Sequence, residues 1–165
     1  MIDPYIRQYG PRLYGLCRTL CASAFDADDL YQDTWLQVMR HIEQYDPQRP
    51  FEPWLTRICV NTYRNRLRRI LRSPVFDAFS TGEEKDAVME RVPAEEGEDH
   101  APLHAAIDRL PEKLRVTVIL FYFRDMDVRS VAHVLNIPPG TVKSRLSKAR
   151  KQLREVLANE TDLRF

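Results

Sequence analysis

The sequence lacks the features that mark several large classes of protein. It has only 5 glycines and no alternating apolar runs of any length, which argues for an all-helical protein. No apolar run approaches the roughly 18 residues that a membrane-spanning helix needs, and no charged-then-apolar leader opens the chain. We therefore expect a soluble, cytoplasmic, all-α protein without direct membrane insertion.

The sequence also has little that resembles a metal site or a catalytic site. The 3 cysteines fit no zinc pattern, and the 4 histidines show no metal-ligand spacing. Cys17 and Cys21 are four residues apart on a predicted helix and are most simply small core residues, with a metal or redox role as the alternative. We expect no metal, no cofactor and no catalytic residue.

Charge is abundant, and it is sorted into blocks although the net charge is only +1. Six arginines and no acids lie between Thr56 and Arg72, and six basic residues and no acids lie between Lys143 and Arg154. The stretch between Asp77 and Pro102 contains nine acids and only two cations, with several prolines and few regularly spaced apolar residues. This distribution predicts two small helical domains, 1–72 and 103–165, joined by an acidic flexible linker over 73–102.

The C-terminal domain has the pattern of a helix-turn-helix. Pro111 suits the first turn of an apolar helix, and Asp127 is the expected N-cap of the short helix that follows. After the break in NIPPG, a long helix from about Pro139 carries apolar residues on one stripe and cations on the opposite side. A second helix of this kind enters the major groove of DNA. A solvated basic helix is the alternative, but it has few acids with which to pair.

The N-terminal domain carries an acidic cluster on a predicted helix. FDADDLYQDTWLQVMRHIEQYD predicts one long helix from Asp26, with Asp29 in the capping-box position. Carboxylates in the first two turns of a helix interact favourably with the helix dipole. This stabilising effect alone can explain why the acids are there. An exposed cluster of acids and amides also suits a basic protein partner.

A further helix is predicted over PWLTRICVNTYRNRLRRILR, with Pro53 in its first turn. One face alternates cationic and amide side chains: Arg57, Asn61, Arg64, Asn65, Arg68 and Arg72. Such a face suits a phosphate backbone and base edges, and Tyr45 and Phe51 in the preceding loop could hold unstacked bases. A polar surface helix is the alternative, but it leaves six arginines without balancing acids. The pattern predicts contact with nucleic acid.

Taken in order, these segments resemble the extracytoplasmic-function (ECF) subfamily of bacterial RNA polymerase sigma factors. DADDLYQDTWLQV is similar to the family's polymerase-binding helix, and FEPWLTRICVNTYRNRLRR to its promoter-melting loop and minus-ten helix. The segment from LPEKLRVTVILFYF to GTVKSRLSKARKQLRE is similar to its C-terminal domain. GTVKSRL alone also resembles response regulators, so the ordered combination carries the resemblance. From the length of 165 residues we expect none of the additional domains of housekeeping sigma factors.

The resemblance implies a role for each matching group of residues, with no active site, metal or cofactor. The residues implied to dock on the clamp helices of the largest polymerase subunit are Asp29, Gln32, Asp33 and Thr34. The residues expected at the minus-ten element, including the loop that captures a flipped base, are Asp46, Arg49, Phe51, Arg57, Asn61, Arg64, Asn65 and Arg68. The residues implied to meet the minus-thirty-five element are Thr141, Lys143, Ser144, Arg145 and Lys148. The implied partners are core RNA polymerase, including the flap of its second-largest subunit, promoter DNA and an anti-sigma factor that is often membrane-bound.

Two departures from the family pattern bear on the base contacts rather than on the fold. Ser130 stands where an acid is common, and Pro138-Pro139 replaces the serine that commonly caps the recognition helix. Two other functions stay open from the sequence: a helix-turn-helix regulator that works without polymerase, and an enzyme acting on nucleic acid. A requirement for core polymerase in DNA binding separates the first of these from a sigma factor.

Overall fold

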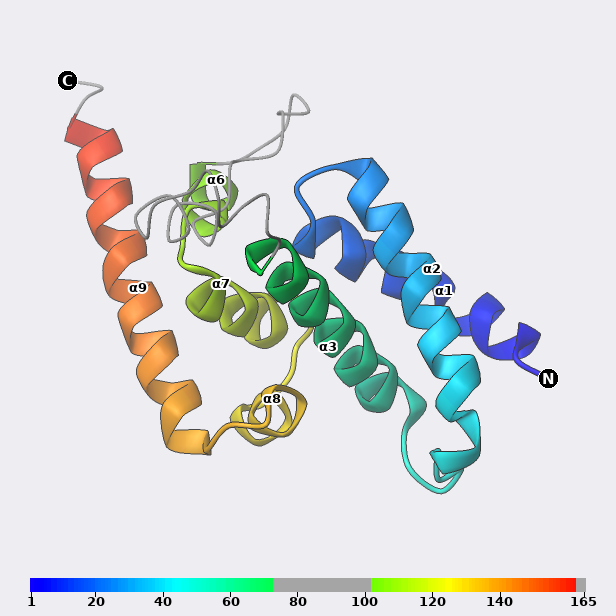
Figure 1. Ribbon diagram of the computed structural model, residues 1–165. Helices are drawn as coiled ribbons and strands as arrows, with labels where there is room; N and C mark the ends of the chain where they lie inside the picture. The colour runs from blue at the N-terminus through cyan, green and yellow to red at the C-terminus, as the bar shows by residue number, and fades with distance from the viewer. Residues whose placement is uncertain (73–101, 163–165) are drawn as a thin grey trace. The chain divides into compact units, whose positions relative to one another are not determined.

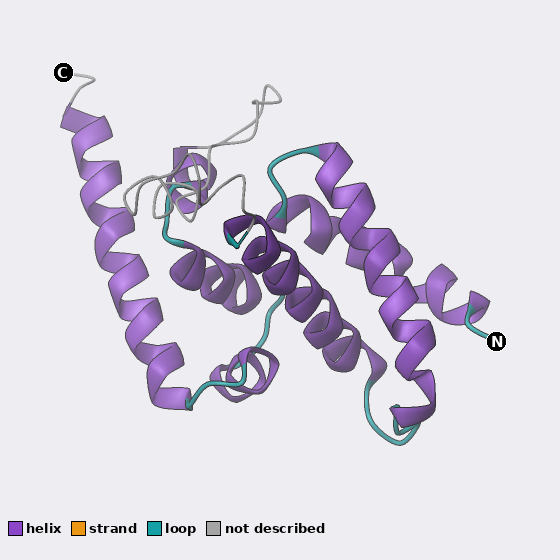
Figure 2. Ribbon diagram, viewed as in Figure 1, coloured by secondary structure: helices purple, strands orange, loops and turns teal. Residues whose placement is uncertain are grey.

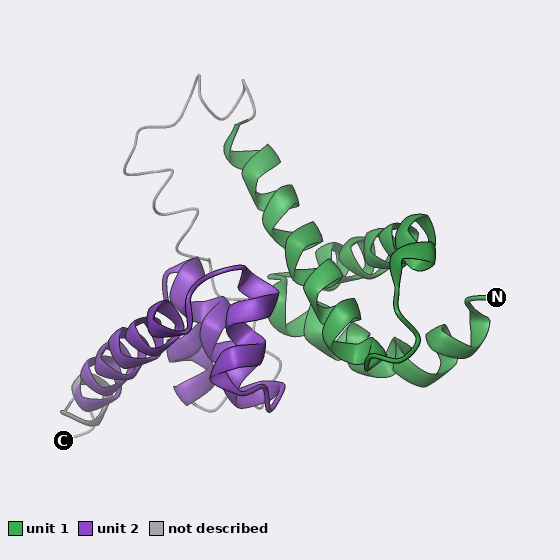
Figure 3. Cartoon of the chain, turned by 90° about the horizontal axis from the view of Figure 1, so that it is seen from below, with its two compact units in different colours: residues 1–79 green, residues 80–165 purple. Residues whose placement is uncertain are grey.

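The computed structural model describes residues 1–72 and 102–162, and all regular structure within these ranges is helical (Figures 1 and 2). The chain divides into two compact units, residues 1–79 and 80–165 (Figure 3). The prediction of an all-α chain with two small helical domains is therefore confirmed. The predicted linker over 73–102 lies, apart from Pro102, outside the described residues. In the parts that are described, no helix is long and apolar enough to cross a membrane.

The first unit consists of three long helices, α1 (Asp3–Leu20), α2 (Ala24–His41) and α3 (Phe51–Leu71), with a short 3-10 helix, η1 (Ile42–Gln44), after α2. Each long helix contacts the other two. Their apolar faces form a common core that includes Leu16, Cys17, Leu20, Leu30, Val38, Leu55, Cys59 and Val60. Cys17 and Cys59 meet across α1 and α3 with their Sγ atoms 3.8 Å apart. The three cysteines are buried, as predicted for core residues.

The bounds of α2 differ from those predicted. The helix begins at Ala24, not at Asp26, because Ser23 is its N-cap and accepts a hydrogen bond from the Asp26 backbone N–H at 3.1 Å. It ends at His41 and passes through η1 into extended backbone at Tyr45. The Asp46–Pro47 pair follows, and a residue that precedes proline is disfavoured in a helix.

The second unit contains α6 (Pro102–Asp108), α7 (Glu112–Val118), a π-helical stretch η2 (Ile119–Phe123), α8 (Val128–Leu135) and α9 (Pro139–Asp162). The apolar run after Pro111 was predicted as helix, and the π-helical stretch widens its last five residues. Asp127 caps α8 as predicted, because its carboxylate accepts a hydrogen bond from the Ser130 N–H at 2.7 Å. Hydrogen bonds from the backbone and the side chain of Ser130 lower the pKa of this carboxyl. Asn136 closes α8 in the left-handed conformation, with φ of 55°.

The helix-turn-helix predicted for the second unit is present as α8, a tight turn and α9. The predicted inner stripe of α9 is buried at Val142, Leu146 and Ala149. These side chains pack into the second unit, where α9 contacts α6, α7 and α8. The opposite side of α9 therefore remains available to a ligand.

Candidate functional site

Three of the four side chains predicted to dock on polymerase share one exposed face of α2. Asp29, Gln32 and Asp33 are spaced three and four residues apart, which places them on the same side of the helix. The carboxylates of Asp29 and Asp33 are about half exposed, at 47% and 50%. Thr34 is different, because its side chain is fully buried and its hydroxyl donates to the Leu30 carbonyl at 2.7 Å. Thr34 therefore supports this acidic face from beneath.

The predicted nucleic-acid face of α3 is assembled in the structure. Five of its six predicted members lie within α3: Asn61, Asn65 and Arg68 are exposed, and Arg57 and Arg64 are half-buried. The sixth, Arg72, is the exposed C-cap residue of the helix. Arg68 donates from Nη1 to the Asn65 amide oxygen at 3.5 Å. The only acid in α3 is Glu52 in its first turn, and Glu52 pairs with Arg12 of α1 at 3.0 Å. The face thus presents cations and amides together, a combination suited to phosphates and base edges.

The loop before α3 is held in shape by Asp46. The Asp46 carboxylate accepts from the Gln48 N–H at 2.9 Å, and its carbonyl accepts from the Arg49 N–H at 3.0 Å. The Arg49 side chain lies 3.8 Å from the same carboxylate, and the Tyr45 hydroxyl donates to the Arg49 carbonyl. Desolvation raises the pKa of Tyr45, which favours the neutral phenol that this hydrogen bond needs. Asp46 and Arg49 are exposed on the outside of a pre-formed turn.

Phe51 lies beneath this loop rather than on it. It is only 3% exposed, and its ring lies 4.4 Å from that of Tyr5 and 5.2 Å from that of Tyr45. Trp54 joins the same cluster with its ring 5.1 Å from Tyr45. Phe51, predicted to belong to the loop that captures a base, therefore packs with Trp54 beneath that loop.

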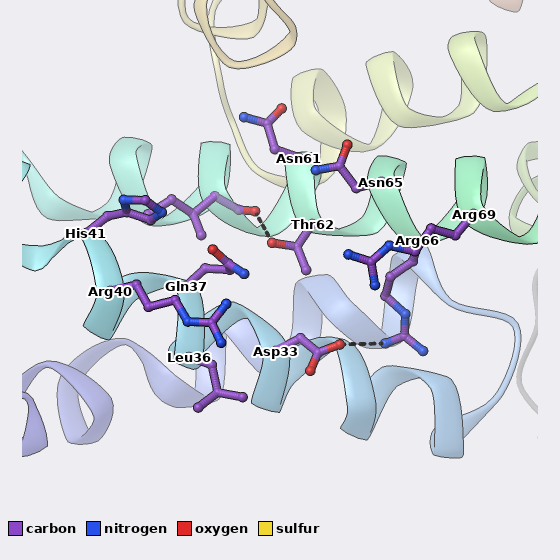
Figure 4. Close-up of a pocket in the computed structure, with 11 residues that line it drawn as sticks. Asp33, Leu36, Gln37, Arg40, His41, Asn61, Thr62, Asn65, Arg66 and Arg69 are labelled. Carbon is purple, nitrogen blue, oxygen red and sulfur yellow. Dashed lines mark hydrogen bonds and ion pairs between the residues drawn. The ribbon is translucent and has the colours of Figure 1, made fainter.

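A groove of about 380 Å³ between α2 and α3 was not predicted from the sequence. Its lining includes Arg40 and His41 from α2, and Asn61, Asn65, Arg66 and Arg69 from α3. Figure 4 shows Arg66 reaching from α3 to Asp33 of α2, while the Asn61 and Asn65 side chains, which also line the groove, point away from α2. No periodicity in one helix could have shown this groove, because it depends on how two separate helices are packed together.

The minus-thirty-five candidates all lie in the first three turns of α9. Lys143, Ser144 and Lys148 are exposed, whereas Thr141 and Arg145 are half-buried. The Ser144 hydroxyl donates to the Thr141 carbonyl at 3.0 Å, and partial burial lowers the pKa of Arg145. Arginine still keeps its charge in proteins, so Arg145 presents a cationic fork at the edge of the helix.

Among the described residues, no group of three or more histidines, cysteines or acids is placed to hold a metal ion. The site is therefore described by surfaces: an acidic face on α2, a cationic and amide face on α3, and a basic face on α9.

Comparison with protein families finds two matches along this chain. Residues 5–72 match the family model for Sigma-70 region 2, and residues 100–153 match that for Sigma-70, region 4. The two matches together cover most of the chain, in the order in which the two units occur.

Similar proteins carry related names. The chain is 33% identical to the ECF RNA polymerase sigma factor SigE of Mycolicibacterium smegmatis over 168 residues, covering 96% of this chain and 62% of that protein. It thus spans less than two thirds of SigE. It is 28% identical to the ECF RNA polymerase sigma factor SigW of Bacillus subtilis, covering 90% of this chain and 84% of SigW.

A solved structure with a similar fold is the sigma factor RpoE in complex with the anti-sigma factor NepR from Bartonella quintana. The TM-score is 0.75 at 25% identity, and the match covers 96% of this chain and 98% of that one. CnrH, solved in complex with the cytosolic domain of CnrY, has the same fold with a TM-score of 0.66 at 22% identity.

Proposed function

This chain belongs to the ECF sigma factors of bacterial RNA polymerase, and we propose that it binds the core enzyme and directs transcription initiation at specific promoters. The observation that carries the proposal is the presence, in one chain and in family order, of the two sigma-70 regions. Each region presents a surface of the chemistry that its role needs. The protein acts through binding alone and is not an enzyme.

The acidic face of α2 is the proposed docking surface for polymerase. Asp29, Gln32 and Asp33 are exposed together, and two half-exposed carboxylates attract a basic helical partner such as the clamp helices of the largest subunit. Thr34 fixes this face from within the core. The apolar helices α6 and α7 of the second unit are proposed to rest against the flap of the second-largest subunit.

The face of α3 and the loop before it are proposed to bind the melted minus-ten element. Arg57, Arg64 and Arg68 contact phosphates, while Asn61 and Asn65 offer amide groups to base edges. The turn at Asp46 and Arg49 receives a base that leaves the stack, and Phe51 supports the turn from below. Extrusion of a base costs on the order of a few kcal/mol, which stacking and pocket contacts offset.

The start of α9 is proposed to recognise the minus-thirty-five element as duplex DNA. Its N-terminal residues enter the major groove, where Lys143, Ser144 and Arg145 reach base edges. Thr141 and Lys148 position the helix against the backbone. Selection is thus divided between duplex recognition upstream and single-strand capture downstream.

An anti-sigma factor is a further proposed partner, because the similar structure of RpoE was solved with the anti-sigma factor NepR. Such a partner would hold the protein inactive in the cytoplasm or at the membrane. The acidic linker, which lies outside the described residues, is proposed to pass through a basic channel of polymerase by mimicking nucleic acid.

Run-off transcription with purified bacterial core polymerase tests the proposed function. The templates are a pool of promoter fragments from the source genome, and the control reaction contains core polymerase alone. We expect new start sites only when the protein is added, with shared upstream sequences. No new starts, together with tight binding to duplex DNA in the absence of polymerase, would instead indicate a free-standing helix-turn-helix regulator.

A further inference from the structure

Arg66 links the two functional faces of the first unit. It projects from α3, the helix of the nucleic-acid face, toward Asp33 of the acidic face of α2 (Figure 4), and its guanidinium pairs with Asp29 of that face as well. Nη2 is 3.6 Å from Asp29 Oδ2, and Nη1 is 3.7 Å from Asp33 Oδ2. The same two acids are the proposed docking residues for polymerase.

These two contacts are ion pairs without good hydrogen bonds. Both distances exceed the usual range for a nitrogen–oxygen hydrogen bond, and Arg66 Nη1 is buried with no hydrogen-bond partner. A guanidinium has five N–H donors in a fixed fork that matches carboxylate or phosphate. Arg66 therefore has N–H donors that could form better hydrogen bonds with another acceptor.

The groove beside Arg66 suits a phosphate as that acceptor. Arg40, Arg66 and Arg69 line it with His41, and Asp33 is the only carboxylate among the described residues of its lining. With Asp33 engaged elsewhere, the remaining polar lining consists of arginine, histidine, amide and hydroxyl side chains, beside the apolar Leu36 and Ile58. A single strand that follows the nucleic-acid face of α3 would meet this groove, because Asn61 and Asn65 belong to both.

We infer that Arg66 is a further DNA-binding residue, held by Asp29 and Asp33 in the isolated protein and transferred to a DNA phosphate when a basic partner engages those acids. The inference rests on the proposed function, since that supplies both the basic partner and the DNA. Asp29 and Asp33 cannot serve Arg66 and an incoming cation equally well. By linkage, whatever weakens the hold of the acids on Arg66 strengthens its binding to phosphate, and the reverse.

The test measures binding of the full chain to DNA without polymerase. The probe is a fluorescein-labelled single strand of about twelve thymidines, which suits a phosphate contact because such contacts are independent of sequence. Asp29→Asn with Asp33→Asn is compared with Asp3→Asn with Asp26→Asn, which removes the same charge from two exposed acids without an ion pair to Arg66. We expect the first pair to raise affinity about five-fold more than the control pair, as for a partly exposed ion pair.

The same acids are then neutralised in an Arg66→Met background. We expect their extra effect to vanish, and the dependence of log affinity on log salt concentration to become shallower by about 0.7. Thermal unfolding of each variant checks that it folds, and Arg66→Gln replaces Arg66→Met if the latter does not. Any of three results would overturn the inference. The gain in affinity could equal that of the control pair, it could persist without Arg66, or no variant could bind the probe.

Run-off transcription by the parent protein keeps this outcome separate from the proposed function. One outcome is that the protein gives new start sites, but neutralising the two acids does not change its affinity for the thymidine strand. This result would leave the sigma-factor function intact and remove the role of Arg66. Absence of polymerase-dependent starts would remove the proposed function, and the thymidine assay would still decide whether Asp29 and Asp33 withhold Arg66 from DNA.

Discussion

Arg145 differs from the other five cations between Lys143 and Arg154, because it alone is half-buried. Partial burial limits the positions that its guanidinium can adopt, and a restricted fork suits a bidentate contact with guanine. Lys148, by contrast, is an exposed point charge suited to a phosphate. Neighbouring cations on one helix are therefore expected to affect specificity and affinity differently.

We expect Arg145→Ala to weaken binding of the polymerase complex to its upstream element by about 1–3 kcal/mol, the value of one good bidentate base contact. Fluorescence anisotropy on matched duplexes, one with the native element and one with a mutated element, measures the loss. Lys148→Ala is the control and should weaken binding to both duplexes alike. The assignment fails if the parent complex binds the two duplexes equally.

Glu112 and Arg115 form an ion pair inside the second unit. Arg115 Nε lies 3.1 Å from Glu112 Oε1 and Nη2 lies 3.4 Å from Oε2, with 0% and 7% of the two side chains exposed. Breaking a buried ion pair by removing one partner is strongly destabilising. The pair thus holds the first turn of α7 in place.

Glu112→Ala is expected to lower the free energy of unfolding by about 3–5 kcal/mol. Urea denaturation measures the loss, and Lys113→Ala at an exposed neighbouring position should change stability by less than about 0.5 kcal/mol. Glu112→Leu combined with Arg115→Met should recover part of the loss, because neither residue then leaves the charge of the other buried. Similar midpoints for the two alanine variants would contradict this account.

Two glycines of α1 differ in how much space surrounds them. A Cβ atom on Gly10 would lie 2.8 Å from the Tyr31 hydroxyl oxygen of α2, whereas one on Gly15 would meet nothing within 4 Å. The Tyr31 ring is confined by Tyr14 and Trp35, with ring centroids 5.7 and 6.3 Å away. Gly10 therefore permits the close approach of α1 and α2, and Gly15 only weakens its helix.

We expect Gly15→Ala to raise the free energy of unfolding by about 0.5–1 kcal/mol, since alanine loses less backbone entropy in a helix. Gly10→Ala should destabilise the protein despite the same gain, because the Tyr31 hydroxyl must move. Chemical denaturation of both variants measures the difference. Adding Tyr31→Phe should rescue Gly10→Ala, and equal stabilisation by both alanines would refute the close approach.

Sequence patterns predicted those elements whose signals are local. Asp127 was identified as a cap because its carboxylate needs only the N–H three residues ahead. The start of α2 was placed wrongly because several polar residues near Asp26 could cap it, and Ser23 does so. The π-helical widening over Ile119–Phe123 depends on packing within the second unit, which a uniformly apolar run does not encode.

The same distinction applies to the candidate site. The spacing of Asp29, Gln32 and Asp33 placed them on one face of a single helix, and the structure agrees. The burial of Phe51 depends on side chains from α1, which the loop sequence does not reveal. The sequence does not reveal the ion pairs of Arg66, because its partners lie on another helix more than thirty residues earlier and only the packing of α2 against α3 brings them together.

The proposed function requires two units with separate cores to act on one promoter. Elements centred near minus ten and minus thirty-five are about 25 base pairs apart, or roughly 85 Å of duplex at 3.4 Å per pair. The 29 residues between the described parts of the units span at most about 95 Å when fully extended. Chain length alone thus permits both units to engage together, and tethering makes the second contact effectively intramolecular.

Changing the length of this segment should therefore change initiation while each surface stays intact. We expect deletion of about twenty of its residues, which leaves a reach of about 30 Å, to abolish run-off from promoters that need both elements. Doubling the segment with glycine and serine should lower initiation only about three-fold, because effective concentration falls as the −3/2 power of linker length. Single-round run-off transcription with each variant measures both effects.

A glycine–serine segment of the natural length separates reach from charge. If length is the only requirement, this control transcribes like the parent, and the acids have no role in the polymerase channel. If the nine acids mimic nucleic acid there, the control loses activity at unchanged length, and restoring the acids to it recovers initiation. Normal initiation by the shortened chain would contradict simultaneous engagement, since the two surfaces could then not both be in contact with promoter DNA.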